Sequence, residues 1–138
     1  MKKIDRLYII DDDEIFHFIT KEIVNSTNLV ENVETFSDGF KAINVLKSVQ
    51  NTPQRLPEMI LLDLNMPILD GWGFLEEYIA LKPKLPKKIT IFIVSSSIDP
   101  IDVEKAKSIH EVKDYIIKPL NEDKFLEIIE GLKTDNNL

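Results

Sequence analysis

The residues best suited to chemistry in this sequence each follow directly after a short apolar run. They comprise three carboxylates, one hydroxyl and one ammonium group, namely Asp11, Asp12, Asp63, Ser95 and Lys118. An apolar run without polar alternation is typical of a strand buried on both faces of a parallel sheet. Open α/β sheets bind their ligands at the carboxyl ends of such strands, so these five side chains are expected to converge on one rim.

Several carboxylates at one site repel one another unless a cation binds them, and an all-oxygen site suits Mg²⁺ or Mn²⁺. Because Mg²⁺ usually takes only one or two carboxylates together with phosphate oxygens, Asp63 is left free to act as a nucleophile and form an aspartyl-phosphate. Phosphoryl transfer needs its oxygens neutralised, for which a metal, Lys118 and Ser95 are suitable. Taken singly, each residue also has a simpler explanation as a helix cap or a solvated charge.

Strands and helices that position these residues are expected to alternate along the chain. The runs predicted as strands are Leu7–Ile10, Val33–Phe36, Met59–Asp63, Ile89–Val94 and Tyr115–Ile117. Each is followed by apolar residues at helical spacing, which predicts five helices. The first, third and fourth runs are the most apolar and should lie in the centre of the sheet. The pattern therefore predicts a doubly wound α/β fold with a parallel five-stranded sheet in the order 2-1-3-4-5.

Details of the helices and connections can also be predicted. Apolar residues recur at helical spacing at Ile15, Phe16, Ile19 and Ile23, which predicts that the first helix follows the first strand directly. The fourth helix is predicted over Asp99–Ile109. Asn51–Pro57 contains two prolines and is predicted to be an exposed loop. Lys82–Lys88 carries four lysines and two prolines, and is interpreted as a solvated linker rather than a binding patch.

Composition limits the classes of function. A net charge of −7 without an evident basic face argues against nucleic-acid binding, and the absence of cysteine excludes disulfides and cysteine zinc sites. The longest apolar stretch is too short to span a bilayer, so no membrane association and a cytoplasmic location are expected. The 138 residues suit one domain, with a core over residues 4–133 and a short polar tail at 134–138.

Four segments together resemble the receiver domain of the response-regulator family of two-component signalling. They are IIDDDE, LLDLNMPILDG, IVSSS and YIIKP, and the resemblance covers residues 4–133. It implies a flavodoxin-like (βα)5 fold in a stand-alone receiver that is not itself an enzyme. Such a protein accepts a phosphoryl group from a histidine kinase or histidine phosphotransfer protein. It then signals by altered binding to a downstream protein target, as a monomer or a phosphorylation-dependent dimer.

The resemblance also implies a role for each candidate site residue. Asp63 would be the phospho-acceptor, and the metal would be held by Asp11, Asp12 and Asp63 with the backbone carbonyl of Asn65. Asp13 is interpreted instead as the residue that starts the first helix.

Three further roles concern the phosphoryl group and the output. Ser95 would be the switch hydroxyl, and Lys118, with a cis bond to Pro119, would contact the phosphoryl group. Tyr115 would be the aromatic switch that moves from an exposed to a buried rotamer. The downstream partner is expected on the surface formed by Ile98–Ile109, Tyr115 and Lys118–Phe125.

Two segments depart from the family pattern, and three alternative functions compete with this interpretation. Ser108–Lys113 lacks the Gly-Ala pair that many receivers have before the fifth strand, and Asn51–Pro57 is unusually long. A phosphatase of similar fold needs a second aspartate as acid, but Asn65 occupies that position and cannot protonate a leaving group. A receiver that works without phosphorylation is disfavoured because the full residue set is present. A flavin-binding module is disfavoured because the acidic residues 11–14 would repel its phosphate.

Overall fold

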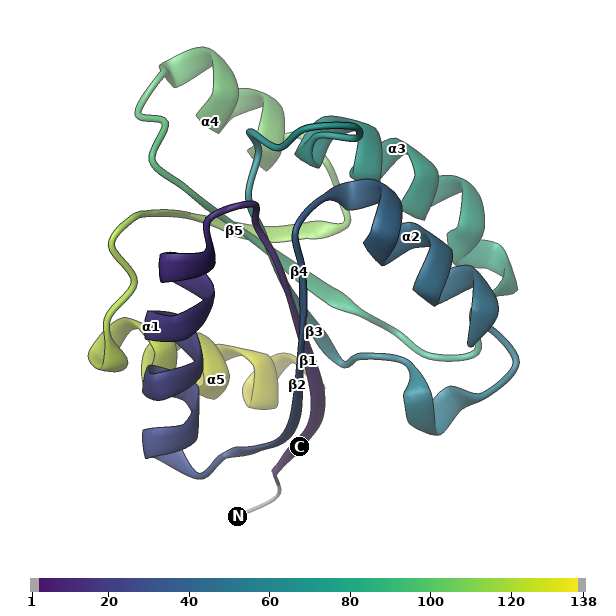
Figure 1. Ribbon diagram of the computed structural model, residues 1–138, viewed down its shortest axis with the longest axis horizontal. Helices are drawn as coiled ribbons and strands as arrows, with labels where there is room; N and C mark the ends of the chain where they lie inside the picture. The colour runs from purple at the N-terminus through teal and green to yellow at the C-terminus, as the bar shows by residue number, and fades with distance from the viewer. Residues whose placement is uncertain (1–2, 137–138) are drawn as a thin grey trace.

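The computed structural model describes residues 3–136, which form a parallel five-stranded sheet between two layers of helices (Figure 1). The strands are β1 (Ile4–Ile10), β2 (Val30–Phe36), β3 (Met59–Leu62), β4 (Thr90–Ser95) and β5 (Val112–Ile117). Their order is β2-β1-β3-β4-β5, and every neighbouring pair is parallel. The predicted flavodoxin-like fold and strand order are therefore confirmed.

The helices cover both faces of this sheet (Figure 1). On one face lie α1 (Glu14–Thr27) and α5 (Glu122–Asn136), and on the other lie α2 (Gly39–Ser48), α3 (Gly71–Leu81) and α4 (Pro100–Lys107). Short 3-10 turns occur at Pro53–Arg55 (η1) and Lys82–Lys84 (η2). Two buried apolar clusters, one on each face, hold the layers together because each removes the inner faces of its helices from water.

Aspartates fix the points at which four of the helices begin. Asp13, Asp38, Asp70 and Asp99 are the N-cap residues of α1 to α4, and each side chain accepts at least one backbone N–H of the first turn. Such caps satisfy donors that the helix itself leaves unpaired. The interpretation of Asp13 as a helix-start residue is supported by hydrogen bonds from the amides of Ile15 (2.9 Å) and Phe16 (3.3 Å) to its Oδ1.

The predicted first helix is present as α1, but not all of its apolar residues are buried. Ile15 is 70% exposed and Ile19 is 49% exposed, whereas Thr20 and Val24 are fully buried. The sheet-facing line runs instead through positions 16, 20, 23 and 24, which is equally consistent with helical spacing. The apolar residues of α1 therefore cover two faces of the helix, and only one of them packs on the sheet.

Several predicted boundaries also need correction. β2 and β5 begin earlier than predicted, at Val30 and Val112, because pairing with β1 and β4 satisfies their backbone groups despite polar side chains. The segment 51–57 is not simply an exposed loop, since it contains η1 and the fully buried Leu56. Nor is the segment 82–88 only a solvated linker: it contains η2, and Lys87 Nζ donates to the Leu56 carbonyl at 3.1 Å.

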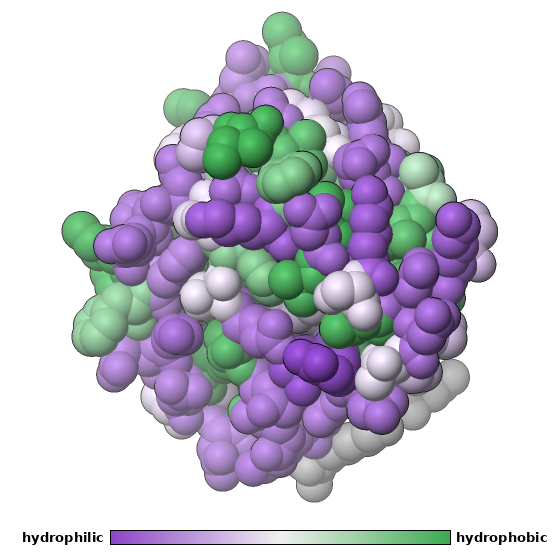
Figure 2. All heavy atoms as spheres, turned by 45° about the vertical axis from the view of Figure 1, so that its right-hand side comes forward, coloured by the Kyte–Doolittle hydropathy of each residue, from purple (hydrophilic) through white to green (hydrophobic). Residues whose placement is uncertain are grey.

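The chain ends and helix ends differ slightly from the predictions. α4 stops at Lys107 rather than at residue 109. Residues 134–136 of the predicted polar tail belong to α5, and residues 137–138 lie outside the described part of the chain. Within residues 3–136, none of the helices has the length and apolar character needed to cross a membrane. The face seen in Figure 2 is mainly hydrophilic, with its hydrophobic side chains in small separate groups.

Candidate functional site

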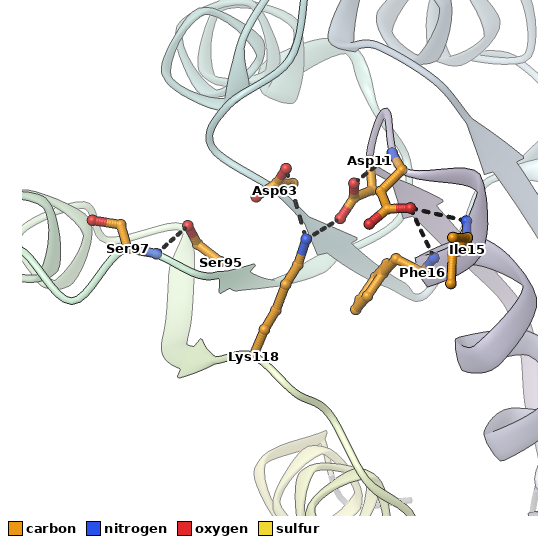
Figure 3. Close-up of polar contacts among 8 residues, drawn as sticks. Asp11, Ile15, Phe16, Asp63, Ser95, Ser97 and Lys118 are labelled. Atoms are coloured by element: carbon orange, nitrogen blue, oxygen red, sulfur yellow. Dashed lines mark hydrogen bonds and ion pairs between the residues drawn. The ribbon is translucent and has the colours of Figure 1, made fainter.

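Four of the five predicted site residues leave the carboxyl ends of four strands and meet at one rim of the sheet (Figure 3). Asp11 follows β1, Asp63 follows β3, Ser95 ends β4 and Lys118 follows β5. Backbone hydrogen bonds hold these ends in register, from the Asp63 amide to the Ile10 carbonyl (2.9 Å) and from the Lys118 amide to the Ser95 carbonyl (2.9 Å). The rim is therefore positioned by the sheet itself.

Lys118 lies between the two buried carboxylates (Figure 3). Its Nζ donates to Asp11 Oδ2 at 2.8 Å and lies 3.9 Å from Asp63 Oδ2. The same ammonium group lies 4.4 Å from the centroid of the Phe16 ring, in a cation–π contact. Its peptide bond to Pro119 is cis, as the resemblance implies. The ammonium group of Lys118 therefore lies beside the carboxylates of Asp11 and Asp63.

Those carboxylates have the arrangement expected of a cation site. One oxygen from each of Asp11, Asp12 and Asp63 lies within 4.8 Å of the others. Asp11 and Asp63 are buried, at 1% and 7% exposure, whereas Asp12 is exposed. Only oxygen ligands are offered, which suits Mg²⁺ or Mn²⁺. Asn65 lies two residues after Asp63 in the connection to α3, with its residue exposed to solvent.

Burial and crowding shift the titration of Asp63. Burial is the main cause that raises its pKa from 3.8 to about 6, and the charge of Asp11 adds to it. The ammonium of Lys118 acts in the opposite direction, together with a backbone hydrogen bond from Leu64, but does not cancel the rise in pKa. The ionised site therefore holds unrelieved negative charge in the folded state, which a bound cation would offset.

A glycine allows α3 to begin against the backbone of Asp63. A Cβ atom on Gly71 would lie 2.4 Å from the Asp63 carbonyl oxygen and 2.8 Å from the Leu64 Cα. Both neighbours are backbone atoms and cannot move aside cheaply. The Gly71 amide also donates to the Leu64 carbonyl at 2.9 Å, so the connection after β3 closes tightly behind Asp63.

The residues predicted to form the switch are joined through Ser97, and this linking role of Ser97 was not predicted. Ser95 is fully buried and its Oγ accepts the Ser97 amide at 3.1 Å. The Tyr115 hydroxyl donates to the Ser97 carbonyl at 2.8 Å, and the Ser97 hydroxyl donates to Asp102 of α4 at 2.7 Å. Ser97 therefore links β4, β5 and α4; the run of three serines after β4 was the only signal of this in the sequence.

Tyr115 differs from the exposed starting position predicted for it. It is only 9% exposed and its ring packs in the apolar cluster that includes α2, α3 and α4 residues. The hydrogen bond to the Ser97 carbonyl explains this inward rotamer, because it satisfies the hydroxyl of a largely buried ring.

Comparison with known proteins gives a consistent result. The model of the response regulator receiver domain matches residues 7–130. A solved two-component response regulator from Cytophaga hutchinsonii is 31% identical, with a TM-score of 0.87 over 96% of this chain and 99% of that chain. The Mn²⁺-bound form of response regulator Rcp1 is 25% identical, with a TM-score of 0.72 over 94% and 92% of the two chains.

Some relatives are longer. A protein-glutamate methylesterase/protein-glutamine glutaminase of Hahella chejuensis is 27% identical over 96% of this chain, but the match spans only 36% of that protein. Those activities are not carried over to this chain, because most of the longer protein lies outside the match. The receiver domain match over residues 7–130 is consistent with the strand order, the cluster of three carboxylates and the position of Lys118 described above. The chain therefore belongs to the response regulator receiver domain family of two-component signalling.

Proposed function

We propose that this receiver accepts a phosphoryl group on Asp63 from a phosphohistidine of a histidine kinase or histidine phosphotransfer protein. The single observation that carries the proposal is the cluster of three carboxylates within 4.8 Å, with Lys118 Nζ 3.9 Å from Asp63. Asp11, Asp12 and Asp63, with the backbone carbonyl of Asn65, would hold Mg²⁺ or Mn²⁺. Bound there, the ion would neutralise phosphoryl oxygens and the charge of the cluster.

The chain's own residues supply the rest of the chemistry. A carboxylate oxygen of Asp63 attacks phosphorus, the nitrogen–phosphorus bond breaks, and the imidazole leaves with its electron pair. Burial of Asp63 limits the access of water, and Lys118 lies close enough to contact a phosphoryl oxygen once the acyl phosphate has formed. The protein acts in its own phosphorylation as a signalling acceptor, without a separate substrate that it turns over.

Phosphorylation by a small donor tests this assignment. Acetyl phosphate should label the protein with Mg²⁺ or Mn²⁺ present and fail to label it in EDTA. Asp63→Asn should abolish the label, whereas Asp70→Asn, which keeps a good helix cap in the same connection, should retain it. Labelling of Asp63→Asn to the wild-type level would refute the choice of acceptor.

The phosphodonor protein would dock on the exposed apolar side of α1. Ile15, Phe18 and Ile19 are 70%, 66% and 49% exposed. Beside them a recess of about 170 Å³ is lined by residues that include Ile15, Phe16 and Lys118, so this surface adjoins the carboxylate cluster. Apolar side chains exposed in a group beside a reactive residue favour a protein partner.

A pair of matched variants separates docking from chemistry. Phe18→Ser should slow transfer from a phosphohistidine protein but leave labelling by acetyl phosphate unchanged. Ile101→Ser removes an equally exposed apolar side chain from α4 and should leave both rates unchanged. Equal slowing by both variants would refute docking on α1.

The signal would leave through Ser95, Ser97 and Tyr115. Movement of the Ser95 hydroxyl toward a phosphoryl group would break its bond with the Ser97 amide and disturb the contacts of Ser97 with Tyr115 and α4. The surface that changes is formed by residues 98–109, Tyr115 and residues 118–125, and a downstream protein would bind there. Tyr115 would act by repositioning within this network rather than by entering the core from solvent, since it is already buried.

A further inference from the structure

Two large apolar side chains are exposed at the rim on the other face of the sheet from α1. Phe40, in the first turn of α2, is 52% exposed, and Ile68, in the connection from β3 to α3, is 78% exposed. Helices α2 and α3 cover the face opposite to the one that α1 covers (Figure 1). These two side chains, named the Phe40–Ile68 patch below, are therefore separate from the exposed apolar residues of α1.

A backbone contact joins the two segments that carry the patch. The Gly39 amide donates to the Leu69 carbonyl at 2.9 Å, and these two residues are the sequence neighbours of Phe40 and Ile68. A Cβ atom on Gly39 would lie 2.8 Å from the Leu69 carbonyl oxygen, so a side chain at this position would obstruct the approach. The patch is therefore carried by one connected piece of backbone rather than by two independent loops.

A strained turn holds Ile68 outward. The Leu69 amide donates to the Pro67 carbonyl at 2.8 Å, which closes a γ-turn around Ile68, whose φ is 70°. The γ-turn with positive φ is rare and strained, and a β-branched residue adopts it at particular cost. Leu69 is partly buried against the core, whereas Ile68 points into solvent and gains little from packing within this chain. The fold therefore bears strain at a side chain that contributes little to its own core.

The same connection lies against the backbone of Asp63. The Gly71 amide donates to the Leu64 carbonyl at 2.9 Å, so the residues between them, which include Ile68, form a closed loop whose two ends lie beside Asp63. The Asp63 side chain is only 8% exposed, so a protein that delivers a phosphoryl group to it has to cover the rim closely. Such a protein would meet α1 on one side of the sheet and the Phe40–Ile68 patch on the other.

We propose that the Phe40–Ile68 patch is a second contact for the phosphodonor protein and fits apolar side chains on the donor surface around its phosphohistidine. The proposal rests on the acceptor role proposed for Asp63. A second copy of this chain is a poor occupant, because the exposed carboxylates that follow β1 at the same rim would repel their counterparts. Burial of the patch by a donor would remove its apolar surface from water and offset the strain at Ile68.

Ile68→Gly separates a docking contact from a structural role, because the variant should be more stable and yet slower in phosphotransfer. Glycine adopts a positive φ without strain, so the urea midpoint should rise. Loss of the buried side chain should lower the second-order rate constant of transfer by about tenfold. The donor is a phosphorylated histidine phosphotransfer protein, chosen from a panel as the one that labels wild type fastest. Phosphoramidate, which has a nitrogen–phosphorus bond but no protein surface, should label the variant at the wild-type rate.

Three further variants complete the test. Phe40→Ser should slow transfer from the donor protein to a similar extent, with labelling by phosphoramidate unchanged. Ile68→Leu keeps an apolar side chain and should keep a transfer rate close to that of wild type. Ile79→Ser is the matched control, because it removes an exposed apolar side chain from the end of α3 away from the rim, and both of its rates should match wild type.

Several outcomes would overturn the proposal. Transfer at the wild-type rate in both Ile68→Gly and Phe40→Ser would do so, as would equal slowing by Ile79→Ser. Equal slowing with phosphoramidate would show that these variants disturb Asp63 itself rather than a docking contact. If phosphoramidate labels wild type but no protein of the panel transfers faster, the patch has no donor to contact. The function proposed for Asp63 fails separately, if phosphoramidate does not label wild type in the presence of Mg²⁺.

Discussion

Asp63→Asn should stabilise the protein in the absence of divalent cations, and the effect should depend on pH. Burial and the neighbouring Asp11 raise the pKa of Asp63 from 3.8 to about 6. At about 1.4 kcal/mol per pH unit, this rise of about two units corresponds to about 3 kcal/mol when Asp63 is fully ionised. An asparagine side chain is close in shape to aspartate and carries no charge, so the variant should recover most of this free energy of unfolding.

The sign of the pH dependence follows from the raised pKa. Ionised Asp63 destabilises the fold fully above its folded pKa of about 6. As pH falls below 6 the folded state takes up a proton first, so the destabilisation decreases and is absent below the unfolded value of 3.8. The advantage of the variant should therefore shrink from about 3 kcal/mol at pH 8 to about 1 kcal/mol at pH 4.5.

Urea denaturation in EDTA at the two pH values measures this difference. With an m-value of about 2 kcal/mol/M, the midpoint should rise by about 1.5 M at pH 8. Glu76→Gln removes an exposed carboxylate from α3 and should shift the midpoint little at either pH. If Asp63→Asn is no more stable than wild type at pH 8, or is stabilised equally at both pH values, then ionised Asp63 does not destabilise the fold and the prediction is refuted.

Three further predictions concern the same part of the fold. Asp12→Ala should melt no lower than wild type without metal, because it removes a repelling charge, and should lose the rise in melting temperature that Mg²⁺ gives wild type. Ser95→Ala should still be labelled at Asp63, but hydrogen exchange with beryllofluoride should change less across residues 98–125 than in wild type; an equal response would exclude the Ser95 route. Ile68→Gly should stabilise the protein by about 1 kcal/mol in urea denaturation, because Ile68 is 78% exposed and is held at a φ of 70° that β-branched residues rarely adopt.

The strands and their order could be predicted because local pattern and burial agree there. The apolar runs Leu7–Ile10, Met59–Leu62 and Ile91–Val94 lie in β1, β3 and β4, and all of their residues are buried. β1 itself begins earlier than predicted, at Ile4, and includes the partly exposed Asp5 and Arg6. The carboxyl ends of β1, β3, β4 and β5 carry the site, so the meeting of Asp11, Asp63 and Lys118 followed from strand order. The first residues of β2 and β5 could not be predicted from apolar runs, because backbone pairing with β1 and β4 determines where these strands begin.

Long-range contacts explain why the predictions for the segments 51–57 and 82–88 were incomplete. Nothing near Leu56 shows that this residue is buried against the core or that its carbonyl accepts a hydrogen bond from Lys87, 31 residues later. Lys82 is likewise positioned by Glu111, which follows it by 29 residues. A segment rich in lysine and proline carries no local signal for such partners, so a solvated linker and a segment bonded to the rest of the fold look alike in the sequence.

The apolar spacing in α1 predicted the helix but not which of its apolar residues are buried, and this distinction bears on function. Hydrophobic periodicity identifies the residues that avoid water, but it does not say whether they are covered by the protein's own sheet or by a partner. In α1 one apolar line meets the sheet, while Ile15, Phe18 and Ile19 remain exposed beside Lys118 and the carboxylate cluster. A helix that carries more apolar positions than its own core can bury, next to the proposed acceptor Asp63, is what a receiver needs if its phosphoryl group comes from another protein. The exposure of Ile15, Phe18 and Ile19 therefore supports the docking surface proposed for the phosphodonor.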